Sequence, residues 1–313
     1  MAGRVASCAA CRRPDTGLWL ILPRLSRASL STHLILFLGQ ICFASLPVVG
    51  RLALADIPAG AIPLVRTVGG ALVFALIAWR RKTLAWPKGD VAFIALCALL
   101  GNVLNQELFI HGLARTTATN AVVIGSTIPV FTVLIAILLR RERARLLRIG
   151  GMAIAFTGVA ILVGADDLST DSDHFVGSLM VLGNSLAYGS YLVIGKPLAE
   201  RYDPVAILAY MFIAGTPMVA PLGIAAFAEA PPLDGGDIAF LAFLIAVPTV
   251  AAYGLVQTGL RRAESSLVAA YIYLQPVFAA IGAVIVLDEH VGPRTIVCGV
   301  IVLFGVWLAA RSR

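Results

Sequence analysis

Two stretches of the chain, GLARTTATNAVVIGSTIPVFTVLIAILLRRE at residues 112–142 and GLRRAESSLVAAYIYLQPVFAAIGAVIVLDE at residues 259–289, align without a gap at a shift of 147 positions. Identical residues recur along the alignment: Gly112-Leu113 with Gly259-Leu260, Arg115 with Arg262, Pro129-Val130-Phe131 with Pro276-Val277-Phe278, and Glu142 with Glu289. The same shift places Gly158 on Gly305. Because Pro, Arg and Glu are not abundant here, these matches indicate a duplication rather than chance similarity.

The composition is typical of a membrane protein. Of the 313 residues, 59% are hydrophobic and only 13% are charged, whereas a soluble domain carries about 25% charged residues. Apolar runs such as 122–139 and 176–194 do not alternate with polar residues, as the strands of a membrane barrel would. Since about 20 apolar residues cross a bilayer as a helix, we predict an all-α, polytopic membrane protein.

The apolar runs predict ten transmembrane helices joined by short connections. Their approximate bounds are 31–50, 60–79, 91–113, 118–139, 147–164, 176–195, 204–227, 237–259, 266–287 and 294–311. Each copy of the duplication contains five helices, and an odd number inverts the second copy in the membrane. We therefore predict two inverted five-helix repeats, at 31–164 and 176–311, after a basic cytoplasmic arm at 1–30.

The basic residues predict the orientation of the chain. Twenty of the 24 lysine and arginine residues lie on one side of the predicted spans, three lie on the other side, and Arg66 lies inside a span. Short loops rich in Lys and Arg stay in the cytoplasm, so we expect both termini there and the protein in the cytoplasmic (inner) membrane. The net charge of +7 is then a topology signal, and we expect no nucleic-acid partner.

The duplicated signature resembles the drug/metabolite transporter superfamily, and specifically its ten-helix EamA-type members. The resemblance rests on a proline within the span, a glutamate after it and a glycine in the next helix, in both copies, and it covers about residues 33–311. It implies two five-helix repeats and transport of a small solute such as an amino acid, another metabolite, a cation or a drug. It implies no particular substrate-binding residue.

Ionisable side chains inside spans are costly and are functional candidates for that reason. Arg66 and Glu107 each lie about six residues from the outer end of neighbouring spans, which is roughly 9 Å at 1.5 Å per residue. We therefore hypothesise that they pair beside an outward-facing cavity. In one interpretation Glu107 binds a substrate amino group or a coupling proton and Arg66 binds a carboxylate; in the other the pair is structural. His111, one turn after Glu107, shares its face and is a weaker candidate.

Other polar residues within spans are further candidates to line the cavity: Gln40, Asn102, Gln106, Asn184, Tyr253, Tyr271 and Gln275. An amide and aromatic lining suits an organic solute better than a bare inorganic ion. The alternative for Asn102, Asn105 and Gln106 is hydrogen bonding between helices. Pro129 and Pro276 are candidate hinges, since proline frees a backbone carbonyl inside a helix, with a static kink as the alternative.

Motifs for enzymatic chemistry are missing from the sequence. It contains no G-x-x-x-x-G-K-[ST] phosphate loop and no H-E-x-x-H spacing, and Gly125-Ser126-Thr127 is not a nucleophile elbow. The C-x-x-C pair Cys8 and Cys11 lacks a second ligand pair nearby. We expect no enzyme, no cofactor, no metal site and no catalytic residue.

These observations favour a secondary transporter that moves a small organic metabolite such as an amino acid, or a drug, outward by alternating access. Protons are a candidate coupling ion, and the bilayer and a small-molecule substrate are the expected partners. A monomer suffices because one chain holds both orientations, although the oligomeric state stays open. Two alternatives remain: a nucleotide-sugar or sugar-phosphate carrier of the same superfamily, and a non-transport membrane enzyme or subunit.

Overall fold

The computed structural model describes residues 30–84, 87, 89–141, 146–164, 173–288 and 290–311, and every regular element within these ranges is helical. The basic arm with Cys8 and Cys11, and the repeated glutamates Glu142 and Glu289, lie outside the described residues. The prediction of an all-α protein is confirmed.

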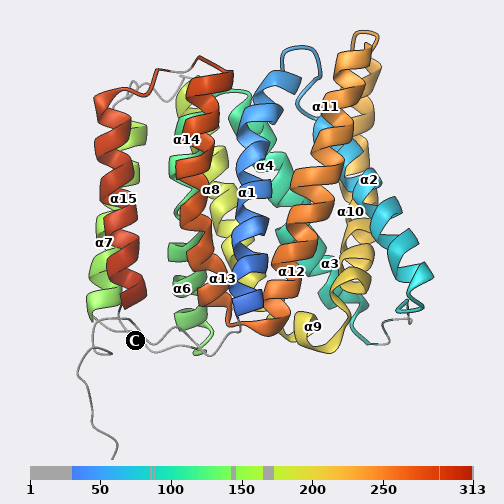
Figure 1. Cartoon of the computed structure of the whole chain (residues 1–313), viewed down its shortest axis with the longest axis horizontal. Coiled ribbons are helices and arrows are strands. Elements are labelled where there is room, and N and C mark those ends of the chain that lie inside the picture. Colours follow the sequence, from blue (N-terminus) through green and yellow to red (C-terminus); the bar gives the residue numbers. More distant parts are fainter. Residues whose placement is uncertain are drawn as a thin grey trace, which may run out of the picture.

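Ten helical rods lie side by side across the molecule (Figure 1). In the first half they are α1 (Leu30–Ala53), α2 (Ala61–Arg80), the rod α3–η1–α4 (Val91–Ala98, Leu99–Val103, Leu104–Leu113), α5–α6 (Ala118–Gly125, Ile128–Leu138) and α7 (Leu146–Gly164). In the second half they are α8 (Asp173–Ile194), α10 (Pro204–Ala228), α11–η2–α12 (Gly235–Ile245, Ala246–Ala251, Ala252–Arg262), α13–η3–α14 (Ser265–Ala270, Tyr271–Leu274, Gln275–Val286) and α15 (Pro293–Arg311). A short helix that the sequence did not predict, α9 (Lys196–Arg201), joins α8 to α10.

The rods have the length and polarity of membrane spans. Among the described residues, eight rods contain an apolar window of 18 residues, and α7 and α15 contain the shorter apolar stretches Ile149–Gly158 and Pro293–Gly305. All ten predicted spans therefore have a helical counterpart. The start of α1, the end of α2 and α9 lie at the end of the bundle that carries the basic loops, which we call the basic side.

The two halves pack through corresponding helices. The second helix of one half, α2, packs on its counterpart α10, and α7 packs on its counterpart α15. In Figure 1 these two pairs lie at opposite edges of the molecule. Between them α1 packs on α12, as α8 packs on α4. The bundle core therefore lies at the junction of the two halves.

Glycines allow the close approach of α7 and α15. A Cβ atom added at Gly158 would lie 2.9 Å from a methyl group of Val302, and one added at its repeat counterpart Gly305 would overlap the backbone of Gly151 and Ala155. Backbone contact of this kind is what small residues provide between membrane helices. The repeated glycine of the sequence signature is thus a packing residue.

Four rods are interrupted, and the interruptions correspond under the 147-residue shift. The π-helical turn η1 begins at Leu99 and η2 begins at Ala246, while the break before Pro129 and the 3₁₀ turn η3 before Pro276 occupy matching positions. A prolyl nitrogen cannot donate to the carbonyl four residues earlier. Each proline is therefore the second residue of a new helix, rather than a kink in a continuous one as the sequence suggested.

Candidate functional site: a central polar cavity

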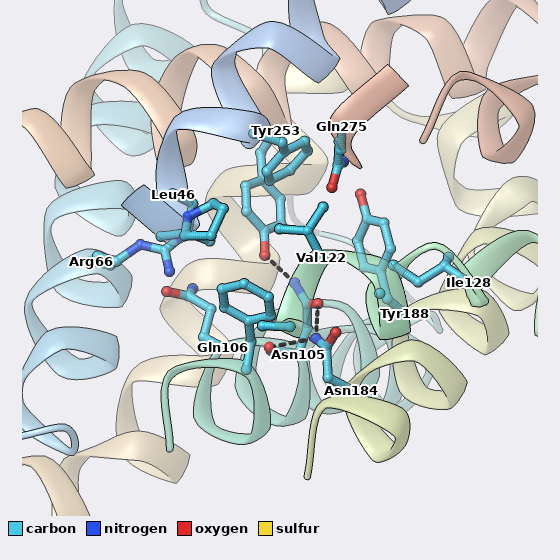
Figure 2. A pocket seen from close by; sticks show the side chains of 15 residues that line it. Leu46, Arg66, Asn105, Gln106, Val122, Ile128, Asn184, Tyr188, Tyr253 and Gln275 are labelled. Atoms are coloured by element: carbon cyan, nitrogen blue, oxygen red, sulfur yellow. Dashed lines mark hydrogen bonds between the residues drawn. The ribbon is translucent and has the colours of Figure 1, made fainter. Parts of the chain in front are cut away.

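A cavity lies at the junction of the two halves, with about 60 Å³ of space for the centres of water molecules (Figure 2). Fifteen residues line it: Phe43, Leu46, Pro47, Arg66, Asn105, Gln106, Phe109, Ala121, Val122, Gly125, Ile128, Asn184, Tyr188, Tyr253 and Gln275. They come from both halves, and all four interrupted rods contribute. Broken helices at a junction of inverted repeats are the usual setting of a transporter's solute site.

One wall of the cavity is a hydrogen-bonded network of amides and a tyrosine. The Asn105 Nδ2 donates to the Tyr253 hydroxyl oxygen at 2.6 Å, and the Tyr253 hydroxyl donates to the Gly101 carbonyl in η1 at 3.2 Å. Asn184 Nδ2 donates to the Asn105 backbone oxygen at 2.7 Å and to its Oδ1 at 2.5 Å. The network joins α4 and η1 of the first half to α8 and α12 of the second. Each amide is thereby held in one orientation at the cavity surface.

Arg66 enters the cavity wall from α2. Its side chain is buried, with 1% of its surface exposed, and its Nε donates to Thr249 Oγ1 at 2.9 Å. Thr249 lies in η2 and in turn donates to the Leu244 carbonyl, five residues earlier, at 2.8 Å. The π-helical turn of the second half therefore positions the arginine of the first half. The Arg66 Nη1 is buried without a hydrogen-bond partner.

Gln106 lies beside Arg66, and Figure 2 shows its amide and the guanidinium pointing toward one another. The Gln106 Nε2 donates to Asn102 Oδ1 and, at 3.4 Å, to Thr67 Oγ1, which places both partners behind the cavity wall. The Gln106 Oε1 and the Asn102 Nδ2 are buried without partners. Two unpaired polar atoms, Arg66 Nη1 and Gln106 Oε1, thus belong to residues at this edge of the cavity, whereas Asn102 is not among the lining residues.

Glu107 does not pair with Arg66, and the hypothesised ion pair is wrong. Its Oε2 lies 3.3 Å from His111 Nε2, one helical turn later, with 10% of the Glu107 side chain and 27% of the His111 side chain exposed. Consecutive helical residues point about 100° apart. Because Gln106 points at Arg66 and the cavity, Glu107 points away from them. The carboxylate and the imidazole form a separate pair outside the cavity lining.

The remaining sequence candidates are divided between the cavity and the periphery. Gln275 lines the cavity and donates to Gln40 Oε1, 2.6 Å away in α1, so Gln40 lies behind it. Figure 2 shows the Tyr188 hydroxyl pointing toward Gln275. Tyr271 is not among the lining residues; its hydroxyl lies 2.5 Å from His33 Nδ1 near the basic side.

Comparison with known proteins identifies the architecture. The profile of the EamA-like transporter family matches this chain twice, over residues 30–164 and residues 175–311. The chain belongs to the EamA-like transporter family. A solved crystal structure has the same fold, with a TM-score of 0.65 at 19% sequence identity. The superposition covers 89% of this chain and 96% of the chain in that structure.

Two of three similar relatives of this EamA-like transporter are named as a transporter or an exporter. A transporter of Archaeoglobus fulgidus is 28% identical over 90% of this chain and 98% of its own length. A probable terminal-alkyne amino-acid exporter of Streptantibioticus cattleyicolor is 29% identical over 71% of this chain and 74% of its own. A WAT1-related protein of Arabidopsis thaliana is 23% identical over 90% of this chain and 85% of its own. The protein is therefore a membrane transporter.

Two polar cavity residues of this EamA-like transporter were not among the candidates from the sequence. Asn105 was considered for hydrogen bonding between helices, and Tyr188 was not singled out. Helical spacing indicates that Tyr188 lines the same cavity as Asn184, because Tyr188 follows Asn184 by one turn and shares its face. Asn105 likewise follows Gly101 by one turn, and it contacts the carbonyl of that glycine at 3.4 Å.

Proposed function

We propose that this protein is a secondary transporter that exports a small organic metabolite through the central cavity by alternating access. The observation that carries the proposal is the cavity itself, whose lining includes residues of four interrupted rods at matching positions of two inverted repeats. Inverted repeats give the two halves similar scaffolds that face opposite sides, so exchanging their conformations exposes a central site to each side in turn.

The lining supports an organic solute of modest size. Asparagine, glutamine and tyrosine side chains offer donors and acceptors, while Phe43 and Phe109 offer apolar surface. The space for the centres of water molecules is about 60 Å³. One water molecule needs roughly 10–15 Å³ of such space, so the cavity holds only a few. A metabolite of amino-acid size fits such a space better than a bulky drug does. The relative named as a probable amino-acid exporter supports the same class.

We further propose that protons energise export through Glu107 and His111. A carboxylate and an imidazole 3.3 Å apart can exchange a proton between them. The pair lies on α4, the helix that also carries Asn105 and Gln106 in the cavity wall. Protonation and solute binding would thus act on the same helix. We place both termini in the cytoplasm and the protein in the inner membrane, because the basic loops gather on one side.

The competing function within the superfamily is transport of a nucleotide sugar or a sugar phosphate. Such a solute carries at least two negative charges, and its site should present several basic groups. Of the fifteen lining residues, Arg66 alone is basic. An enzymatic alternative lacks support from the described ranges, since no cluster of three or more His, Cys, Asp or Glu side chains there could hold a metal ion.

The test is uptake into proteoliposomes of amino acids and related metabolites, with and without a pH gradient. The informative variant is Gly125→Leu, because Gly125 lines the cavity and a Cβ added there meets nothing within 4 Å. The added side chain fills the cavity without displacing the backbone, and we expect it to abolish flux. Gly150→Leu is the control, since a Cβ at Gly150 in α7 also meets nothing within 4 Å. Flux that survives in Gly125→Leu, or no flux of any solute in the native protein, would refute the proposal.

A further inference from the structure

The cavity wall contains one positive charge with no negative charge to balance it. Arg66 is the one formally charged residue among the fifteen that line the cavity. None of the ion pairs formed within the described part of the chain includes Arg66. Its sole hydrogen-bond partner there is the neutral Thr249, and its Nη1 has none.

Leaving a buried charge unpaired costs several kcal/mol. The prediction from sequence was that Glu107 would supply the missing charge, and the structure directs Glu107 to His111 instead. A neutral residue at position 66 would fill the same wall at lower cost if packing were its purpose. The guanidinium therefore requires a partner that enters the cavity from outside the protein.

A second donor stands beside the guanidinium. The nitrogen and oxygen atoms of an amide are assigned from its hydrogen bonds, and here the assignment leaves Gln106 Oε1 and Asn102 Nδ2 unpaired. If both amides turn over together, their mutual hydrogen bond is kept in the reverse direction. Thr67 Oγ1 now accepts a hydrogen bond from Gln106 Nε2, and after the turn it can donate to Gln106 Oε1 instead. The Gln106 N–H group then faces the same space as Arg66 Nη1.

We propose that the transported solute carries a carboxylate, which binds to Arg66 and to the Gln106 amide, and that Arg66 determines this specificity. A carboxylate matches the planar guanidinium and neutralises its single charge. A phosphate dianion would leave one negative charge unbalanced among the other lining residues, which are all neutral. A solute that carries only an amine meets a like charge and no carboxylate.

The geometry also separates the carboxylate from the amino group of an amino acid. The cavity offers an ammonium group amide oxygens and the faces of aromatic rings, but no Asp or Glu among the lining residues. The acid is thus required and the amino group is not. Because Arg66 of the first half is held by Thr249 of the second, a bound carboxylate contacts the junction of the two halves.

This inference rests on the proposed transport function, and one experiment separates the two. The culture medium of cells that produce the native protein is compared, by untargeted mass spectrometry, with that of cells that lack it. We expect the enriched solutes to be carboxylic acids. Arg66→Gln should reduce their enrichment at least about tenfold, the effect of losing one charge-assisted hydrogen bond. Arg80→Gln, the same change at an exposed position of α2, should leave it unaltered.

The acid found in this way is then tested in proteoliposomes with the native protein, beside its primary amide and its des-amino analogue. We expect transport of the acid and the des-amino acid, and none of the amide. This step needs no variant, so it decides the matter even if Arg66→Gln fails to fold. Enrichment or transport of neutral solutes and amines in place of acids would overturn the carboxylate inference and leave the transporter intact. No enrichment of any solute would overturn both.

Discussion

Tyr253 of the second half donates its hydroxyl to the Gly101 carbonyl of the first half across 3.2 Å. Gly101 lies in the π-helical turn η1, where the regular α-helical ladder is interrupted. The same hydroxyl accepts from Asn105 at 2.6 Å. One phenol thus joins a helix irregularity, a cavity amide and the junction of the repeats.

Tyr253→Phe should destabilise the protein by about 1 kcal/mol, the usual scale of hydrogen bonds between membrane helices, and should also slow transport. The phenyl ring keeps its edge contacts with Phe43 and Phe212, at centroid distances of 5.2 and 5.3 Å. The hydrogen bonds of the Tyr253 hydroxyl to the Gly101 carbonyl and to the Asn105 amide are lost, and only the longer contact of 3.4 Å between Asn105 Nδ2 and that carbonyl remains. Thermal unfolding in detergent and initial transport rates measure the two effects.

Tyr271→Phe is the matched control, because it also removes a tyrosine hydroxyl that pairs with a polar group, His33, but away from the cavity. We expect a comparable loss of stability with an unchanged transport rate. Equal slowing of transport by both substitutions would show that the Tyr253 hydroxyl has no special role at the cavity.

Glu107→Gln should uncouple transport from the pH gradient. The substitution keeps the shape of the side chain and removes its titratable charge. Because Glu107 does not line the cavity, downhill flux of the solute should persist while acceleration by a pH gradient is lost. Parallel measurements of gradient-driven and downhill flux in proteoliposomes distinguish these two effects. Glu229→Gln, at an exposed carboxylate after α10, should respond to the gradient as the native protein does; an unchanged response of Glu107→Gln would exclude it as the proton site.

Gly305→Ala should reduce the free energy of unfolding by about 1–3 kcal/mol, the usual cost of overpacking. Its added Cβ would overlap backbone atoms of α7, which cannot rotate away. Gly299→Ala in the same helix is the control, because its nearest contact is a Val123 methyl group at an ordinary 3.8 Å. Denaturation in detergent compares the two, and equal stabilities would contradict close packing of α7 against α15.

The helical architecture was predictable because it depends on patterns that a single sequence contains. Apolar runs, the distribution of basic residues and the 147-residue repeat together indicate ten helices in two copies. The interruptions before Pro129 and Pro276 had a visible cause in the missing prolyl N–H. The π-helical turns at Leu99 and Ala246 had none, since nothing in these apolar stretches marks an extra residue per turn.

The pairing of polar residues was harder to predict than their presence. Arg66 and Glu107 have similar depths in neighbouring spans, and depth is what hydropathy reports. Whether two side chains meet depends on the rotation of each helix about its axis, and the turn η1 immediately before α4 changes that rotation. As a consequence, Arg66 donates a hydrogen bond to Thr249 of the other half, and Glu107 lies beside His111 on its own helix.

Two basic side chains cap helices at opposite ends of the bundle. Arg51, at the end of α1, donates to the Leu113 carbonyl at 2.8 Å, and Lys196, after α8, donates to the Leu260 carbonyl at 2.6 Å. Leu113 and Leu260 are repeat counterparts. Each cation also meets the negative end of a helix dipole. The two contacts therefore tie the first helix of each half to the third, one at each side.

Arg51→Gln should loosen the side opposite the basic loops, and Lys196→Gln should loosen the basic side. A single cysteine at position 122 in the cavity wall, in a protein whose five natural cysteines are replaced, reports access from each side by its rate of labelling with an impermeant maleimide. We expect Arg51→Gln to speed labelling from the opposite side alone and Lys196→Gln to speed it from the basic side alone, so each variant serves as the control for the other. Equal acceleration from both sides in either variant would show that the caps stabilise the helices without controlling access.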